Sequence, residues 1–109
     1  MSPTQRSLAK LKAEGWTVAI VERFNIYAKV RQDLFGFIDL VAMRPTGGIV
    51  GVQVTTGSNA AAHVEKIKNE PKAAIWLASC VKIVVHGWRK VGARGKRKLW
   101  ECREIVVGG

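Results

Sequence analysis

Two nearly continuous apolar segments in the middle of the chain constrain the fold most strongly. Residues 37–43 and 49–55 are rich in aliphatic and β-branched side chains, and a turn with Pro45 and two glycines separates them. This pattern predicts a β-hairpin. Because strands that are apolar along most of their length must be covered on both faces, we expect an α/β fold with a mixed central sheet and a helix on each face.

The sequence on either side of this hairpin predicts the remaining elements of one domain over residues 1–109. Ser2 and Pro3 favour the start of a helix, and Gly15 favours its end. Apolar periodicity and turn residues predict helices over residues 3–14, 60–69 and 72–79, and further strands over residues 16–24, 80–87 and 99–107. Residues 25–31 and 88–98 are expected to be irregular connections, and the second helical region is interrupted at Pro71.

The charge balance narrows the choice of partner. The chain carries 18 Lys and Arg against 8 Asp and Glu, a net charge of +10. So much uncompensated positive charge favours a polyanionic partner, and nucleic acid is the first candidate. An anionic membrane surface is a weaker candidate, since no long basic amphipathic helix is visible, and solubility alone is a further explanation. No apolar run is long enough to span a membrane, so no membrane partner is expected.

The N-terminal region and the cysteines favour a cytoplasmic protein. Lys10, Lys12 and Glu14 fall where a secretory signal would be apolar. Cys80 and Cys102 lie far apart and form no CxxC pair, so a zinc site is not expected. We expect reduced thiols, with a disulfide between the two cysteines as the alternative.

Two polar residues, Asp39 and Gln53, interrupt the apolar strands of the predicted hairpin. They lie at similar distances from the turn, so we expect them to be neighbours on adjacent strands. Asp33 comes just before the first of these strands, and Glu22 lies near the end of the preceding predicted strand. Together these oxygen donors predict a pocket for Mg²⁺ or Mn²⁺.

Beside a basic surface, such a pocket suggests metal-assisted hydrolysis of phosphodiester bonds. The alternative is structural, because ion pairs that stabilise a fold are common. In that interpretation Asp39 pairs with Arg31 or Arg44, and Gln53 bonds to the backbone.

The chain resembles the PD-(D/E)XK nuclease superfamily, and within it the Holliday-junction-resolvase-like and phage-associated nuclease domains. The resemblance rests on the αβββαβ order over residues 3–88, on Gly-x-x-Asp at residues 36–39, and on the polar-x-polar motif at residues 53–55. It implies a restriction-endonuclease-like core and a metal-dependent DNA endonuclease acting on branched, Holliday-junction-like or phage DNA. It also implies the cytoplasm of a bacterial or phage-infected cell.

The resemblance assigns catalytic roles by position. Asp39 matches the metal-binding aspartate, and Gln53 takes the place of the family's glutamate. Thr55 takes the place of the family's lysine, and Lys66 on the following helix is the candidate to replace that lysine. The family's additional acid has three candidates here, which are Glu14, Glu22 and Asp33.

Basic side chains outside this pocket are candidates for DNA contacts. A glycine-containing segment near the C-terminus is rich in Lys and Arg without any acid, as expected of a phosphate-binding loop. Its alternative is a solvated loop. The candidate contacts are Arg31, His63, Arg89, Lys90, Arg94, Lys96, Arg97 and Lys98.

Aromatic residues and His63 leave several interpretations open. Trp88 and Trp100 flank the basic segment and are expected to cover an edge of the core, with stacking on unpaired bases as the alternative. Trp16 and Trp76 are expected in the core. His63 is a candidate general base, a phosphate contact or an exposed helix residue.

Three functions are therefore weighed. The first is a metal-dependent DNA endonuclease, and the second is a DNA-binding module on the same fold whose site has degenerated at Thr55. The third is an unrelated basic protein with a ribosomal or RNA partner. A homodimer is a further hypothesis, because twofold proteins suit symmetric DNA sites.

Overall fold

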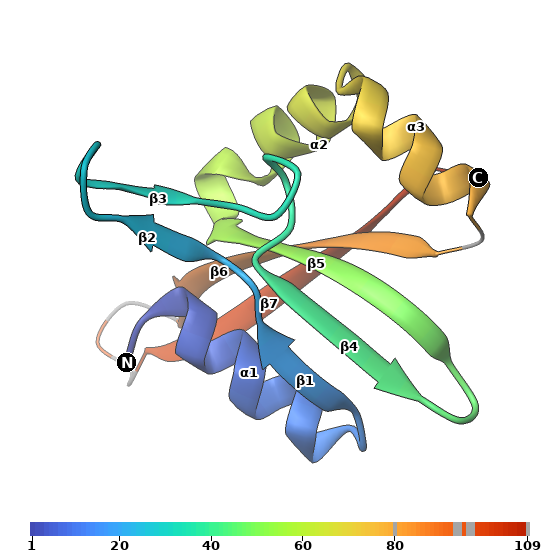
Figure 1. Cartoon of the computed structure of the whole chain (residues 1–109). Coiled ribbons are helices and arrows are strands. Elements are labelled where there is room, and N and C mark those ends of the chain that lie inside the picture. The colour runs from blue at the N-terminus through green and yellow to red at the C-terminus, as the bar shows by residue number, and fades with distance from the viewer. Residues whose placement is uncertain (80, 93–94, 96–97, 109) are drawn as a thin grey trace.

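The computed structural model describes residues 1–79, 81–92, 95 and 98–108, which form a five-stranded mixed sheet, a separate two-stranded sheet and three α-helices (Figure 1). The helices are α1 (Pro3–Ala13), α2 (Ala60–Lys68) and α3 (Pro71–Ala78). The strands are β1 (Thr17–Ile20), β2 (Arg23–Asn25), β3 (Val30–Gln32), β4 (Leu40–Arg44), β5 (Gly48–Thr56), β6 (Lys82–Val91) and β7 (Leu99–Val107). Within these described ranges, no helix is long and apolar enough to cross a membrane.

The large sheet has the order β1-β4-β5-β6-β7. The predicted hairpin is confirmed, because β4 pairs with β5 in antiparallel register from Leu40↔Val52 to Arg44↔Gly48. β5 and β6 are parallel, so the chain must cross over between them, and α2 and α3 make that crossover. β7 then returns antiparallel to β6 at the edge.

Helices cover both faces of the large sheet, as expected (Figure 1). On one face, Leu11 of α1 packs with Leu40, Ala42, Val50 and Val52. On the other face, Val64, Ile67 and Ala73 of α2 and α3 pack with Ile83 and Val85 of β6. Successive residues of a strand point to opposite faces, so the α1 face takes Val50 and Val52 while the α2/α3 face takes Gly51, Gln53 and Thr55.

The strand predicted over residues 16–24 is wrong in its second half. The chain leaves the large sheet after β1, and residues 23–32 form the separate antiparallel hairpin β2–β3 instead of an irregular connection. The side-chain oxygen of Asn25 accepts hydrogen bonds from the amides of Tyr27 and Ala28, both at 3.0 Å, and this local bonding turns the chain.

Two other predicted boundaries are also corrected. The strand predicted from residue 37 begins only at Leu40, because Phe35 and Gly36 adopt positive φ angles of 56° and 85° and form a tight turn. At the other end of the chain, β6 continues to Val91. Arg89 and Lys90 are therefore strand residues in register with Glu101 and Trp100, and not loop residues.

Candidate metal centre

Three carboxylates meet at one end of the β4–β5 hairpin. Glu22, Asp33 and Asp39, which we call the acid cluster, each place a carboxylate oxygen within 4.8 Å of the others. The β2–β3 hairpin brings the first two together, because the pairing of Arg23 with Gln32 makes the residues on either side of it neighbours. Both Glu22 and Asp33, which were alternatives for the additional acid, are therefore at the site.

Asp39 is the buried member of the acid cluster, with 3 % of its surface exposed. Its Oδ2 accepts two hydrogen bonds of 2.7 Å, from Nε2 of Gln53 and from the amide of Val54. The predicted contact between Asp39 and Gln53 is thus confirmed. It follows from the antiparallel register, which places these residues just beyond the Leu40↔Val52 pair.

The structural alternative for Asp39 is wrong, because neither arginine pairs with this carboxylate. Arg31 forms an ion pair with Glu22 at 3.2 Å. Arg44 donates from Nη1 to the carbonyl of Glu14 at 2.9 Å, and its guanidinium lies 4.1 Å from the centre of the Trp16 ring.

Gln53 contacts the acid cluster through its amide nitrogen. Its side chain is 3 % exposed, and Nε2 also donates to Oδ2 of Asp33 at 3.3 Å. Its Oε1 is buried and has no hydrogen-bond partner among the described residues. A buried amide oxygen without a partner costs about 1–3 kcal/mol. Carboxylate and amide oxygens are the ligands that Mg²⁺ and Mn²⁺ prefer, so the three carboxylates fit a hard divalent cation, and Oε1 of Gln53 would join them once its amide group turned over.

The electrostatics of the acid cluster also favour a cation. Burial and the neighbouring carboxylate of Asp33 raise the pKa of Asp39 to about 8, against the opposing effect of the Val54 amide. Without a cation, Asp39 therefore holds a proton at neutral pH. A divalent cation bound to Asp39 would replace that proton.

The other predicted catalytic residues lie on two different elements. Thr55 is half-buried on β5, on the same face as Gln53 two residues earlier. Lys66 on α2 lines a hollow of about 600 Å³ together with Asp33 of the acid cluster. The third candidate for the additional acid is excluded, because Glu14 caps the far end of α1 and pairs with Lys10.

The predicted DNA-contacting residues are spread over the molecule. Arg31 lines the hollow beside Lys66, and so does Lys72, which sequence reasoning missed. Arg89 and Lys90 lie on β6, where Arg89 pairs with Glu101 at 3.3 Å. Three predicted contacts, Arg94, Lys96 and Arg97, lie outside the described residues, and Lys98 immediately precedes β7.

His63 and the tryptophans complete this comparison. His63 is half-buried on α2 and is not among the residues that line the hollow.

Trp88 is buried and donates to Oγ of Ser7 at 2.8 Å, which confirms its place in the core. Trp100 is 41 % exposed and lies against the guanidinium of Arg6. Trp16 and Trp76 are partly buried and pack against the two core clusters.

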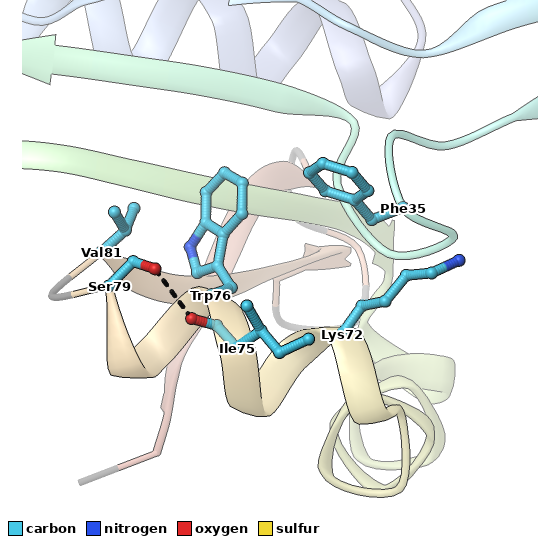
Figure 2. Close-up of a pocket in the computed structure, with 6 residues that line it drawn as sticks. All are labelled: Phe35, Lys72, Ile75, Trp76, Ser79 and Val81. Carbon is cyan, nitrogen blue, oxygen red and sulfur yellow. Dashed lines mark hydrogen bonds between the residues drawn. The ribbon is translucent and has the colours of Figure 1, made fainter.

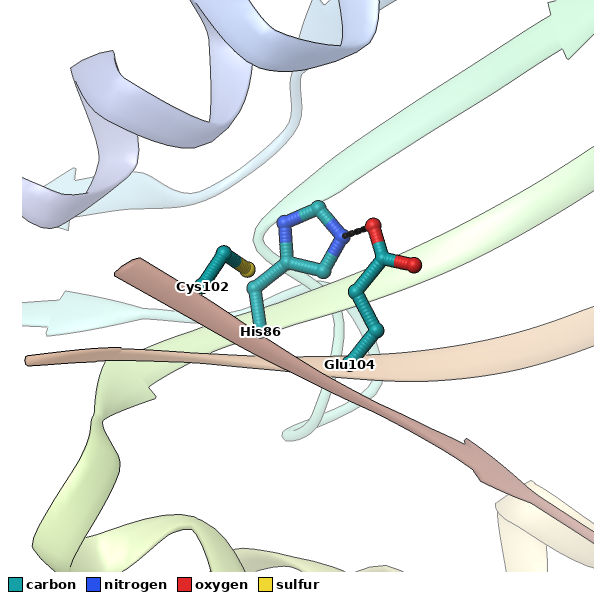
Figure 3. Close-up of side chains that lie close together, drawn as sticks. All are labelled: His86, Cys102 and Glu104. Atoms are coloured by element: carbon teal, nitrogen blue, oxygen red, sulfur yellow. Dashed lines mark ion pairs between the residues drawn. The ribbon is translucent and has the colours of Figure 1, made fainter. Parts of the chain in front are cut away.

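A second polar group lies under α1 on the opposite face of the sheet. His86, Cys102 and Glu104, which we call the histidine cluster, come from β6 and β7 (Figure 3). Nδ1 of His86 is 2.9 Å from Oγ of Ser7, and Nε2 is 3.5 Å from Oε1 of Glu104. Sequence reasoning missed this group and its contact with α1, because Ser7 lies 79 residues from His86 in the chain.

The thiol of Cys102 is free, as expected, and burial raises its pKa to about 12. The other cysteine, Cys80, lies outside the described residues. A thiol with this pKa is protonated at neutral pH and is a poor nucleophile.

Comparisons of this chain with protein-family models, curated proteins and solved structures gave no match.

Proposed function

We propose that this protein is a metal-dependent DNA endonuclease built on the restriction-endonuclease-like core of the PD-(D/E)XK superfamily. The observation that carries the proposal is the meeting of Glu22, Asp33 and Asp39, two of which bond to the buried amide of Gln53. Asp33 and Asp39 have no basic partner among the described residues, and their mutual repulsion destabilises the fold unless a cation or a proton lies between them.

Each residue then has a defined role. Asp39, Asp33 and Glu22 would hold Mg²⁺ or Mn²⁺, together with Oε1 of Gln53. When bound, the cation polarises the phosphate and lowers the pKa of the attacking water. Lys66, or the hydroxyl of Thr55, orients that water.

The substrate is held by charge. Arg31 and Lys72 lie beside Asp33 in the same hollow, where they would contact phosphates on either side of the cleaved bond. The net charge of +10 adds long-range attraction to DNA. Branched or phage DNA is the proposed substrate, and a homodimer would present one site to each of two strands.

One observation favours a second function. Thr55 occupies the position of the family's lysine and brings no positive charge to it, as expected of a DNA-binding module that has lost catalysis. Lys66 distinguishes the two functions, because it lines the same hollow as Asp33 and only an active enzyme would need it for catalysis.

A cleavage assay tests the proposal. Supercoiled, linear, single-stranded and four-way-junction DNA are incubated with the protein in Mg²⁺, Mn²⁺ or EDTA. We expect cleavage that requires the metal and falls at least about 100-fold in Asp39→Asn, since it removes the central ligand. Lys66→Ala should lower the rate about 10- to 100-fold, whereas Lys68→Ala on the same helix should not.

The controls separate the candidate functions. DNA binding without cleavage would favour the binding module, if the affinity falls as the salt concentration rises and is unchanged by EDTA. Cleavage that survives in Asp39→Asn would show a contaminating nuclease and would overturn the proposal.

A further inference from the structure

An apolar groove of about 440 Å³ lies between α3 and the turn that precedes β4 (Figure 2). Its lining residues are Phe35, Lys72, Ile75, Trp76, Ser79 and Val81. Ile75 is 66 % exposed, and the hydroxyl of Ser79 donates to the carbonyl of Ile75 at 3.0 Å. With its hydroxyl bonded to the helix, Ser79 adds little polarity, and the groove suits a flat apolar ligand.

Phe35 is held at the mouth of this groove by an unfavourable backbone conformation. Its φ angle is 56°, in the left-handed region that bulky residues rarely adopt. The ring meets Trp76 edge-on, with 6.2 Å between ring centres, yet half of the residue stays exposed. The backbone of the turn holds this conformation, because the amide of Phe37 donates to the carbonyl of Leu34 at 3.2 Å across Phe35 and Gly36, and the turn leaves the ring at the groove.

The groove is continuous with the proposed metal centre. Phe35 and Lys72 line both the groove and the hollow that contains Asp33, Arg31 and Lys66. A DNA strand with a phosphate at the acid cluster would therefore have an adjacent nucleotide at the groove. Lys72 would meet the phosphate of that nucleotide, and the ring of Phe35 would offer a face to its base.

We infer that this groove binds an unpaired nucleobase of the DNA strand held at the acid cluster. The inference rests on the proposed function and narrows its substrate class to DNA with a single-stranded segment beside the cleaved bond, such as a single strand, a flap or a branch. A base inside an intact duplex is stacked and paired, so it cannot reach the groove unless it is flipped out.

The tip of the β2–β3 hairpin provides a matched control. Tyr27 there is 95 % exposed and is not among the residues that line the groove. If exposure alone determined base stacking, Tyr27 would be the better platform. Truncation of each aromatic residue in turn therefore distinguishes the groove from the hairpin.

The test measures binding to a single-stranded oligonucleotide that carries 2-aminopurine, in EDTA so that no strand is cut. Phe35→Asn removes the ring and keeps the turn, because Asn tolerates positive φ. We expect it to weaken single-strand binding about 5- to 100-fold, the range measured for loss of one base stack. Phe35→Tyr should restore binding, and Tyr27→Ala should retain it. Thermal unfolding by circular dichroism checks that each variant is folded.

The inference is overturned by unchanged affinity in Phe35→Asn, by a loss confined to Tyr27→Ala, or by no binding of single strands. Its failure can be distinguished from failure of the proposed function. If the protein binds single strands through Phe35 but cleaves no DNA, the inference about the groove holds and the proposed nuclease function fails. A chain that cleaves DNA but binds single strands equally well with and without the Phe35 ring supports the nuclease and overturns the inference about the groove.

Discussion

The acid cluster and the histidine cluster are both buried polar groups, and they lie on opposite faces of one sheet. In the histidine cluster, His86 bonds to Ser7, which also accepts from Trp88, and Glu104 lies 3.1 Å from Lys10. Cys102 is the one member without such a partner among the described residues. In the acid cluster, Asp33 and Asp39 share the buried amide nitrogen of Gln53, and neither carboxylate has a basic partner among the described residues. Burial alone therefore does not mark a site, whereas unmatched charge and hydrogen-bonding capacity do.

The two clusters also differ in what they would do with a cation. Lys10 already places a positive charge on Glu104, and both ring nitrogens of His86 already have a neighbour, Ser7 at 2.9 Å and Glu104 at 3.5 Å. The histidine cluster is therefore suited to fasten α1 to the sheet and not to bind a metal. In the acid cluster, Asp33 and Asp39 have no basic partner among the described residues, and a divalent cation would supply the missing positive charge.

Removal of the histidine should have the largest effect on stability. His86→Ala leaves a cavity and deprives Ser7 of a partner, so we expect the free energy of unfolding to fall by about 3 kcal/mol. Urea denaturation in EDTA measures this loss. His63→Ala on α2 is the matched control and should cost far less, because His63 is only half-buried. A small loss in His86→Ala would show that the histidine cluster does not fasten α1.

Mg²⁺ should stabilise the protein through the acid cluster only. At concentrations about 10 to 100 times its dissociation constant, it should raise the free energy of unfolding by about 1–3 kcal/mol. Asp39→Asn should abolish this stabilisation, and Glu104→Gln in the other cluster should retain it. Denaturation with and without Mg²⁺ measures the difference, and loss of the effect in Glu104→Gln would reverse the roles of the two clusters.

The two clusters should respond to pH with opposite signs. Since the pKa of Asp39 rises from 3.8 to about 8 on folding, its contribution is complete below pH 4 and is lost as the pH rises through about 8. Burial lowers the pKa of His86, so its contribution is complete above about pH 6.5 and is lost as the pH falls through the folded-state pKa. Between pH 6.5 and 8.5 in EDTA, stability should therefore fall with pH, and Asp39→Asn should flatten that slope. If the free energy of unfolding still falls with pH in Asp39→Asn, a group other than Asp39 loses the proton in this range.

The smallest effect concerns the thiol of the histidine cluster. Because burial raises the pKa of Cys102 to about 12, native protein should alkylate at this residue at least about tenfold more slowly than the urea-unfolded chain at pH 8. Mass spectrometry of peptides after iodoacetamide treatment measures the rate at this one position. Equal rates in the two states would show that the α1 face opens readily.

Local pattern was sufficient to predict the centre of the acid cluster. The apolar segments fix the β4–β5 hairpin, and antiparallel pairing then places Asp39 beside Gln53 from their distances to the turn. The β2–β3 hairpin could not be predicted in the same way, because its three-residue strands are too short for a period of two to be visible. The sequence therefore left Glu22 and Asp33 as alternatives, and the hairpin brings both to the site.

By itself, the sequence determined the two-faced sheet, the helices on either side of it and the strongly positive charge, because apolar periodicity and composition are properties of short segments and of the whole chain. The tertiary structure alone decided which polar groups meet. It brought Ser7 into contact with His86, which lies 79 residues away in the chain. It also made the apolar groove adjoin the hollow lined by Lys66, because Phe35 and Lys72 line both. Such contacts depend on how distant elements pack, which no local pattern encodes.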